Sequence, residues 1–202
     1  MTPTQLAILI GILLIVRVIL HFSKKIKIEE KRRKVLYEYL DSIIIAGVTA
    51  LVLIHFVVRT FYIPSTSMVP TLVKHDYIMV NEFIYRFKTP ERREIVVFHP
   101  PESANAGGKD FIKRVIAVEN DEIEVKEGKV FINNVVQDEP FINEAPEYLM
   151  EKRKVPEGSL FVMGDNRNNS DDSHRWGFLP RKNVVGKAFL IFWPPQRIRV
   201  LK

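Results

Sequence analysis

The hydrophobic positions of the chain form two long apolar stretches, followed by many short ones. Residues 6–22 are apolar except for Gly11, Arg17 and His21, and residues 42–58 are interrupted only by small or weakly polar residues and one histidine. A helix of about 20 apolar residues spans a bilayer. Both stretches therefore predict membrane-spanning helices. A cleavable signal peptide, the alternative for the first stretch, carries its positive charges before the apolar run, whereas here they follow it.

A basic segment separates the two apolar stretches. The net charge of the chain is +6, and seven lysines and arginines gather between Lys24 and Lys34. Short basic loops between spans stay on the cytoplasmic side, so the charge indicates a membrane-flanking role rather than nucleic-acid binding. We expect one membrane helix in residues 1–22, a basic cytoplasmic loop in 23–40, a second membrane helix in 41–60 and an extracytoplasmic β-rich domain in 61–202.

Beyond residue 61 the apolar residues alternate with polar ones in short runs, which is typical of β-strands. No segment there has a helical period. Lys126-Glu127-Gly128 is a hairpin signal, residues 103–109 read as a loop, and residues 141–154 are charged and irregular. The fold class predicted is mostly β, with strands at residues 77–80, 94–98, 111–118, 122–125, 129–132, 159–163 and 187–192.

Composition excludes several kinds of chemistry. The chain has no cysteine, so it has no disulfide, no thiolate nucleophile and no cysteine zinc site. Its five histidines show no pair at metal-ligand spacing such as HxxxH. We therefore expect neither a metal nor another cofactor.

A stiff, hydroxyl-rich segment follows the second apolar stretch. Pro64 and Pro70 in the sequence IPSTSMVPTL fix the backbone and remove two donors, so this segment is neither a helix interior nor a central strand. Such a turn could present Ser67 as a nucleophile close to a membrane surface. The alternative is a simple linker after a membrane anchor.

Lys113 lies within the strand predicted at residues 111–118. Alternation places it on one side with Phe111 and Val115, and places Arg114 on the other side. A lysine in a strand usually points to water. Phe111 and Val115 are typical of a buried face, however, and burial lowers the pKa of a lysine amine. A neutral amine beside a serine hydroxyl can act as a general base without histidine or aspartate.

Residues 164–173, with the sequence GDNRNNSDDS, collect carboxylates, amides, hydroxyls and an arginine. The simplest interpretation is a polar turn between strands. Pairing between aspartate and arginine can also brace a loop, and Ser170 or Ser173 could orient a neutral lysine by hydrogen bonding.

Three blocks together resemble bacterial type I signal peptidases: IPSTSMVPTL, DFIKRVIAV and GDNRNNSDDSHRWGFLP. The similarity runs from about Phe61 to the end of the chain, and the two apolar stretches add the topology of that family. The resemblance implies two transmembrane helices followed by an all-β catalytic domain with a Ser/Lys dyad. It also implies a membrane-bound serine endopeptidase that cleaves N-terminal signal peptides from exported preproteins after A-x-A-like sites.

The resemblance assigns roles residue by residue. Ser67 matches the acylating serine, Lys113 the general base, Ser65 a donor to the oxyanion beside the Ser67 N–H, and Ser170 the serine that orients the lysine. Two further groups match the bracing residues and the lining of pockets for small side chains. They are Asp165, Arg167 and Asp172 for bracing, and Phe61, Ile63, Pro64, Met68, Leu72, Phe111 and Ile112 for the pockets.

Two positions depart from the pattern of the family. Thr66 stands where many members have glycine, which restricts the backbone between the serines. His174, followed by Arg175, stands where many members have the arginine that pairs with the aspartate at Asp172. Either side chain could fill that role, and the sequence leaves the partner of Asp172 open.

The partners that the resemblance implies are preprotein signal peptides, the lipid bilayer and nearby protein-export machinery, with no nucleic acid. The membrane could be a bacterial plasma membrane or a thylakoid. One rival interpretation is a self-cleaving repressor with a similar Ser/Lys β-fold, which should carry a helix-turn-helix where this chain has apolar stretches. Another is a non-enzymatic membrane scaffold, which would have no need for Ser67 and Lys113.

Overall fold

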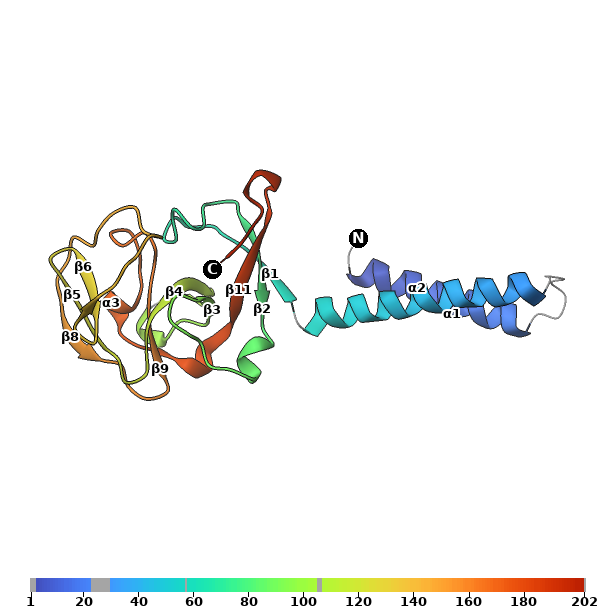
Figure 1. Cartoon of the computed structure of the whole chain (residues 1–202), viewed down its shortest axis with the longest axis horizontal. Coiled ribbons are helices and arrows are strands. Elements are labelled where there is room, and N and C mark those ends of the chain that lie inside the picture. The colour runs from blue at the N-terminus through green and yellow to red at the C-terminus, as the bar shows by residue number, and fades with distance from the viewer. Residues whose placement is uncertain (1–2, 23–29, 57, 105–106, 202) are drawn as a thin grey trace. The chain divides into compact units, whose positions relative to one another are not determined.

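The computed structural model describes residues 3–22, 30–56, 58–104 and 107–201 (Figure 1). The chain divides into two compact units, Met1–Val58 and Arg59–Lys202. We call them the helical unit and the β-rich unit and describe each by itself.

The helical unit consists of α1 (Pro3–Phe22) and α2 (Glu30–Phe56), which lie side by side (Figure 1). Arg17 of α1 forms an ion pair with Asp41 of α2, and Arg33 Nη2 donates to the carbonyl oxygen of Leu20 at 2.5 Å. From Arg17 to Leu20 the contacts advance along α1, whereas from Asp41 to Arg33 they go back along α2. The two helices are therefore antiparallel.

Both helices are long and apolar enough to cross a membrane, over Thr4–Phe22 and Glu30–Val52. Several large apolar side chains on them are exposed. Ile8, Ile15 and Ile45 are 59%, 60% and 66% exposed. Exposed apolar surface of this extent on a helix pair is stable in lipid rather than in water.

The boundaries predicted for the basic loop and the second helix differ from the structure. Residues 23–29 of the predicted loop lie outside the described residues, whereas residues 30–40 belong to α2, which begins at Glu30 and ends at Phe56. Lysine, arginine and glutamate are good helix formers, so the basic residues extend the helix. The last four carbonyl groups of a helix have no partner within the helix. Leu20 has one of these at the end of α1, and its carbonyl oxygen accepts a hydrogen bond from Arg33.

The β-rich unit contains two sheets. The larger has eight strands, in the order β1-β2-β11-β3-β4-β9-β10 with β12 paired to β11, and the smaller has the order β7-β6-β5-β8. The strands are β1 (Val58–Tyr62), β2 (Tyr77–Asn81), β3 (Ile95–Phe98), β4 (Phe111–Val118), β5 (Glu122–Lys126), β6 (Lys129–Ile132), β7 (Val135–Val136), β8 (Met150–Lys154), β9 (Ser159–Met163), β10 (Leu179–Pro180), β11 (Val184–Trp193) and β12 (Arg199–Val200). Short helices connect some of them: η1 (Ile84–Arg86), η2 (Glu102–Ala104), α3 (Ser173–Trp176), η3 (Arg181–Asn183) and η4 (Pro195–Arg197).

The seven strands predicted from alternation are all present, and the predicted hairpin is formed by β5 and β6. Lys126 pairs with Lys129 across a two-residue turn. Glu127 and Gly128 have φ angles of 51° and 68°. A type I′ turn needs positive φ at both central residues, which glycine adopts without strain.

The structure adds elements that the pattern did not predict. The segment predicted to be irregular, residues 141–154, contains β8, which pairs with β5 at the edge of the smaller sheet. Only Met150 of this strand is buried, and its charged residues are exposed. Charged side chains are common on edge strands because they hinder pairing with other chains. Strands β1, β7, β10 and β12 and the one-turn helix α3 are likewise additions.

Strand β4 positions the candidate site. It lies between β3 and β9, antiparallel to both. Residues 113–117 of β4 are all buried, so both faces of the strand are covered. The strand carries Lys113 on one face and Arg114 on the other, as alternation predicts, but neither cation reaches solvent.

Candidate active site

Ser67 lies on a turn that the core holds in place. We call residues 63–72 the serine turn. Its base is closed by a hydrogen bond from Ile63 N to Asp76 O at 2.9 Å, and Leu72 N donates to Met68 O at 2.8 Å. The side chains of Met68 and Leu72 are 1% and 0% exposed within the hydrophobic core. The apolar residues that flank Ser67 thus anchor the turn.

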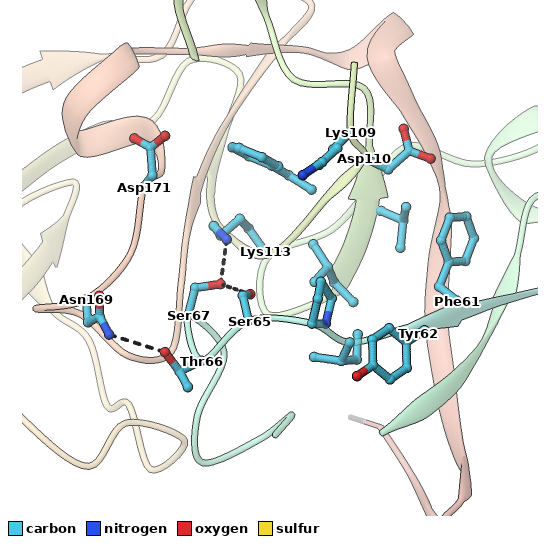
Figure 2. Close-up of a pocket in the computed structure, with 15 residues that line it drawn as sticks. Phe61, Tyr62, Ser65, Thr66, Ser67, Lys109, Asp110, Lys113, Asn169 and Asp171 are labelled. Atoms are coloured by element: carbon cyan, nitrogen blue, oxygen red, sulfur yellow. Dashed lines mark hydrogen bonds between the residues drawn. The ribbon is translucent and has the colours of Figure 1, made fainter. Parts of the chain in front are cut away.

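The structure brings together the serine and the lysine that the sequence singled out (Figure 2). Lys113 Nζ donates to Ser67 Oγ at 2.8 Å. The lysine is 4% exposed and the serine 8%. Ser65 Oγ lies 3.3 Å from Ser67 Oγ, at the long end of hydrogen-bonding distance.

The environment of Lys113 lowers the pKa of its amine. Burial of the amine is the largest influence and lowers the pKa to about 8, against the smaller opposing influence of Asp172, Asp171 and Asp165. An ordinary lysine has a pKa of about 10.4. At neutral pH the amine in this structure is therefore deprotonated in roughly one molecule in ten, far more often than a solvated lysine.

A polar loop, residues 164–173, holds the serine turn from the other side. Asn166 N donates to Ser67 O at 3.0 Å, and Asn169 Nδ2 donates to Thr66 Oγ1 at 3.2 Å. Thr66, the residue that departs from the common glycine, thus connects the two segments. A Cβ added at Gly164 would lie 2.3 Å from the Ser67 carbonyl oxygen. The close approach of the two backbones therefore requires glycine at this position.

Asp165 connects the polar loop to β4. It forms a bidentate pair with Arg114, with Nε–Oδ1 and Nη2–Oδ2 distances of 2.8 and 2.7 Å, and also accepts a hydrogen bond from Thr71. Both charged residues are almost fully buried. The guanidinium of Arg114 also lies over the ring of Phe141, 4.1 Å from its centroid. Arg114 therefore fixes the polar loop against the strand that carries Lys113.

Arg167 braces the loop through a different acid. Its guanidinium forms a bidentate pair with Glu139, at 2.6 and 2.8 Å, and Nε donates to Gly164 O at 3.1 Å. The arginine is 1% exposed. Asp165 and Arg167, close together in sequence, thus reach separate partners.

The structure identifies the partner of Asp172, which the sequence left open. His174 Nδ1 is hydrogen-bonded to Asp172 Oδ1 at 2.7 Å, and Gly164 N donates to Oδ2 at 2.8 Å. Burial alone would raise the pKa of Asp172, but these hydrogen bonds hold the pKa below its usual range. His174, rather than Arg175, therefore fills the bracing position, and Tyr148 stacks on its ring at 4.3 Å.

Ser170 is buried beside this network. It is 4% exposed, and its hydroxyl makes no hydrogen bond of normal geometry with the described part of the chain, although it lies close enough to Asp172 to help lower the pKa of that carboxyl. Lys113 donates instead to Ser67. The predicted orienting role of Ser170 therefore stays a prediction.

A cleft of about 390 Å³ runs past the Ser67–Lys113 pair. Of the residues predicted to line pockets, Phe61, Ile63, Pro64, Phe111 and Ile112 do so. Met68 and Leu72 do not, because they point into the core and hold the serine turn. The other residues that line the cleft are Tyr62, Ser65, Thr66, Val97, Lys109, Asp110, Asn169 and Asp171.

Sequence reasoning missed residues that matter for the site. Arg114 and Thr71 both bind Asp165, and Glu139 binds Arg167. Alternation on β4 could have indicated Arg114, because an arginine between Ile112 and Ile116 needs a buried acid. Glu139 lies in a charged segment with no comparable signal. Among the described residues, no group of three or more acids and histidines could hold a metal ion.

The fold and this pair of side chains place the chain in a family of peptidases. The profile of the family described as "Signal peptidase, peptidase S26" matches residues 36–193. A match over this share of the sequence shows that the chain belongs to the signal peptidase family, and it confirms the resemblance and the peptidase class predicted from the three blocks.

Curated proteins of similar sequence support the same family assignment. The chain is 45% identical over 164 residues to "Probable signal peptidase I-1" of Synechocystis sp., covering 79% of this chain and 84% of the relative. It is 42% identical to "Signal peptidase I" of Leptolyngbya laminosa, with 81% and 82% covered. It is 46% identical to "Thylakoidal processing peptidase 1, chloroplastic" of Arabidopsis thaliana, over 67% of this chain and 42% of that protein. A solved signal peptidase I from Enterococcus faecalis matches with 30% identity and a TM-score of 0.44, covering 50% of this chain and 97% of that one.

Proposed function

We propose that this member of the family cleaves N-terminal signal peptides from exported preproteins, with Ser67 as nucleophile and Lys113 as general base. The observation that supports this most is the 2.8 Å hydrogen bond between two buried side chains, in a cleft open to substrate. Among the described residues Lys113 forms no ion pair, and burial disfavours its charged form, which makes the neutral amine more available as a base.

The geometry allows each step of an acyl transfer. Ser67 Oγ attacks the carbonyl carbon of the scissile bond while its proton passes to Lys113 Nζ. The tetrahedral intermediate collapses, and the proton moves from Nζ to the leaving amine. Water then attacks the acyl group with Lys113 again as base, which releases the signal peptide and restores Ser67. The Ser65 hydroxyl and the Ser67 N–H would hold the oxyanion, a contribution of about 3–4 kcal/mol per donor.

The apolar part of the cleft suits small residues before the scissile bond. Phe61, Ile63 and Ile112 line it, and Met68 and Leu72 support it from the core. An apolar lining favours apolar side chains, and the family resemblance implies that these are small, so we expect cleavage after A-x-A-like sequences.

The direct test of the function is cleavage of a model preprotein by the detergent-solubilised full-length chain. Its product should carry a new N-terminus directly after an A-x-A-like sequence, located by mass spectrometry. The Ser67→Ala variant, purified in the same way, shows how much cleavage comes from contaminating peptidases. Intact preprotein after long incubation with the wild type would refute the proposal.

The pH dependence of cleavage should follow Lys113. Only the neutral amine accepts the serine proton, so kcat/KM should rise as pH increases through the pKa of about 8. A profile measured from about pH 6 to 10 should have its ascending limb centred near pH 8. An ascending limb near pH 6.5, the ordinary pKa of histidine, would contradict lysine as the base. His174, which is bound to Asp172, would then be the first residue to test.

We propose that both helices span the membrane and that the β-rich unit lies on the extracytoplasmic side, because the basic segment is retained inside. The chain has no cysteine, so introduced cysteines report without background. Lys31 and Leu149 are exposed positions in α2 and just before β8. In intact cells, Leu149→Cys should react with a membrane-impermeant thiol reagent, whereas Lys31→Cys should react only after the membrane is permeabilised. The reverse pattern would overturn the orientation.

A further inference from the structure

Asp171 places a carboxylate at the mouth of the cleft. It lines the cleft together with Ser67 and Lys113, and it is exposed. Figure 2 shows Asp171 and Asn169 on one side of the Ser67–Lys113 pair and Phe61 and Tyr62 on the other. The cleft therefore has a largely apolar side at Phe61 and Tyr62, near which Lys109 and Asp110 also lie, and Asp171 on the opposite side, with the reacting groups between them.

The carboxylate of Asp171 is available to a ligand. Within the described residues it forms no hydrogen bond and no ion pair. The other acid of the cleft, Asp110, is engaged instead, because His99 Nδ1 lies 2.6 Å from its Oδ1. Where the structure describes the chain, the hydrogen bonds that hold the polar loop do not involve the Asp171 side chain.

The backbone on either side of Asp171 is firmly held. Ser170 and Asp172 are 4% and 0% exposed, and Asp172 is bound by Gly164 and His174. Asn169 is bound to the serine turn through Thr66. A charge on a rigid segment loses little freedom when it binds a ligand, so it discriminates better than a charge on a mobile loop.

Asp171 also lies close enough to the reacting groups to affect them. Burial, the main influence, lowers the pKa of Lys113, while the charges of Asp172, Asp171 and Asp165 oppose that shift. Asp172 and Asp165 are fully buried and bound to His174 and Arg114. Of the three acids, only Asp171 is exposed to the cleft, where a substrate could reach it.

We propose that Asp171 is a specificity-determining residue that favours a cationic side chain, and disfavours a carboxylate, at the second residue after the scissile bond. This inference rests on the proposed function. If the apolar side of the cleft holds the end of the signal peptide, the chain beyond Ser67 must continue past Asp171. A lysine or arginine there meets an opposite charge, and a glutamate or aspartate meets a like charge.

The test compares two model preproteins that differ only in lysine or glutamate at the second residue of the mature segment. With the full-length enzyme in detergent at low ionic strength, kcat/KM for the lysine substrate should be about five-fold higher, as expected for one pair of partly solvated charges. The preference should shrink toward one at about 1 M salt, where the Debye length is roughly 3 Å. Asp171→Asn should abolish the preference, and Asp171→Lys should reverse it.

The matched control is Glu151→Gln, which removes one exposed negative charge from β8, outside the residues that line the cleft. It should leave the five-fold ratio unchanged. Equal cleavage of both substrates by the wild type at low salt would overturn the inference while leaving the proposed function intact. A ratio that persists in Asp171→Asn would also overturn it. Failure of the wild type to cleave either substrate would instead refute the proposed function.

Discussion

The single variants Ser67→Ala and Lys113→Ala should each lower kcat for preprotein cleavage by at least about 10⁴-fold. Ser67→Ala removes the atom that forms the acyl intermediate. Lys113→Ala removes the base at 2.8 Å, so the hydroxyl keeps its proton. Because the two groups act as a unit, the double variant should be no slower than either single one. Rates are measured by quantifying product from a labelled preprotein under single-turnover conditions.

Two further variants separate the chemistry of Lys113 from its packing. Lys113→Met keeps most of the buried stem without the amine, and it should be as inactive as the alanine variant while its thermal unfolding resembles that of the wild type. Lys113→Arg keeps a cation, but a guanidinium stays protonated and cannot act as base, so it should also be inactive. Substantial turnover by Ser67→Ala, with the protein folded, would contradict the nucleophile assignment.

Local pattern was sufficient to predict most of the strands. The strand containing Lys113 has the predicted bounds, because a run of β-branched and aromatic residues has a strong local preference. The β5–β6 hairpin followed from its turn residues. By contrast, β8 is a short charged edge strand that exists because β5 offers it a partner. A strand that forms because of its partner need not have an alternating apolar pattern, so hydrophobicity does not reveal it.

The start of the second helix could not be predicted from hydrophobicity either. Its apolar part predicted a span beginning near residue 42, but α2 begins at Glu30. Hydrophobicity predicts the part of a helix that lies in lipid. The helix itself can extend further, where residues favour the helical backbone and its groups find hydrogen-bond partners. Arg33, which satisfies the carbonyl of Leu20 at the end of α1, is such a partner, and its role depends on the antiparallel packing of the two helices.

The site was predictable where chemistry is local and unpredictable where it depends on distant pairing. Ser67 and Lys113 were identified by their surroundings in sequence and by the family resemblance. The family resemblance placed Met68 and Leu72 among the residues of the substrate pocket. In the structure both are buried in the core, where they anchor the serine turn, and neither lines the cleft. The choice of His174 for Asp172 needed the geometry of the loop.

The pairing of Arg114 with Asp165 leads to a large expected effect on stability. Both side chains are at most 2% exposed, and the pair joins the strand of Lys113 to the polar loop. Asp165→Asn should lower the free energy of unfolding by about 3–5 kcal/mol, because it removes one charge of a buried, bidentate ion pair. The matched control is Glu82→Gln, which breaks the exposed pair with Arg59 and should change stability by less than about 1 kcal/mol. Both are measured by denaturant unfolding of the full-length chain in detergent.

A second replacement should recover part of the loss. In Asp165→Asn combined with Arg114→Met, both charges of this pair are removed, so the double variant should be more stable than Asp165→Asn alone. Activity should not recover with it. The bidentate pair and the hydrogen bond from Thr71 to Asp165 hold the polar loop against both Lys113's strand and the serine turn, and methionine and asparagine cannot replace that geometry. An Asp165→Asn enzyme with unchanged stability would show that the pair does not hold the site together. Recovery of activity along with stability would show that the pair matters only for folding.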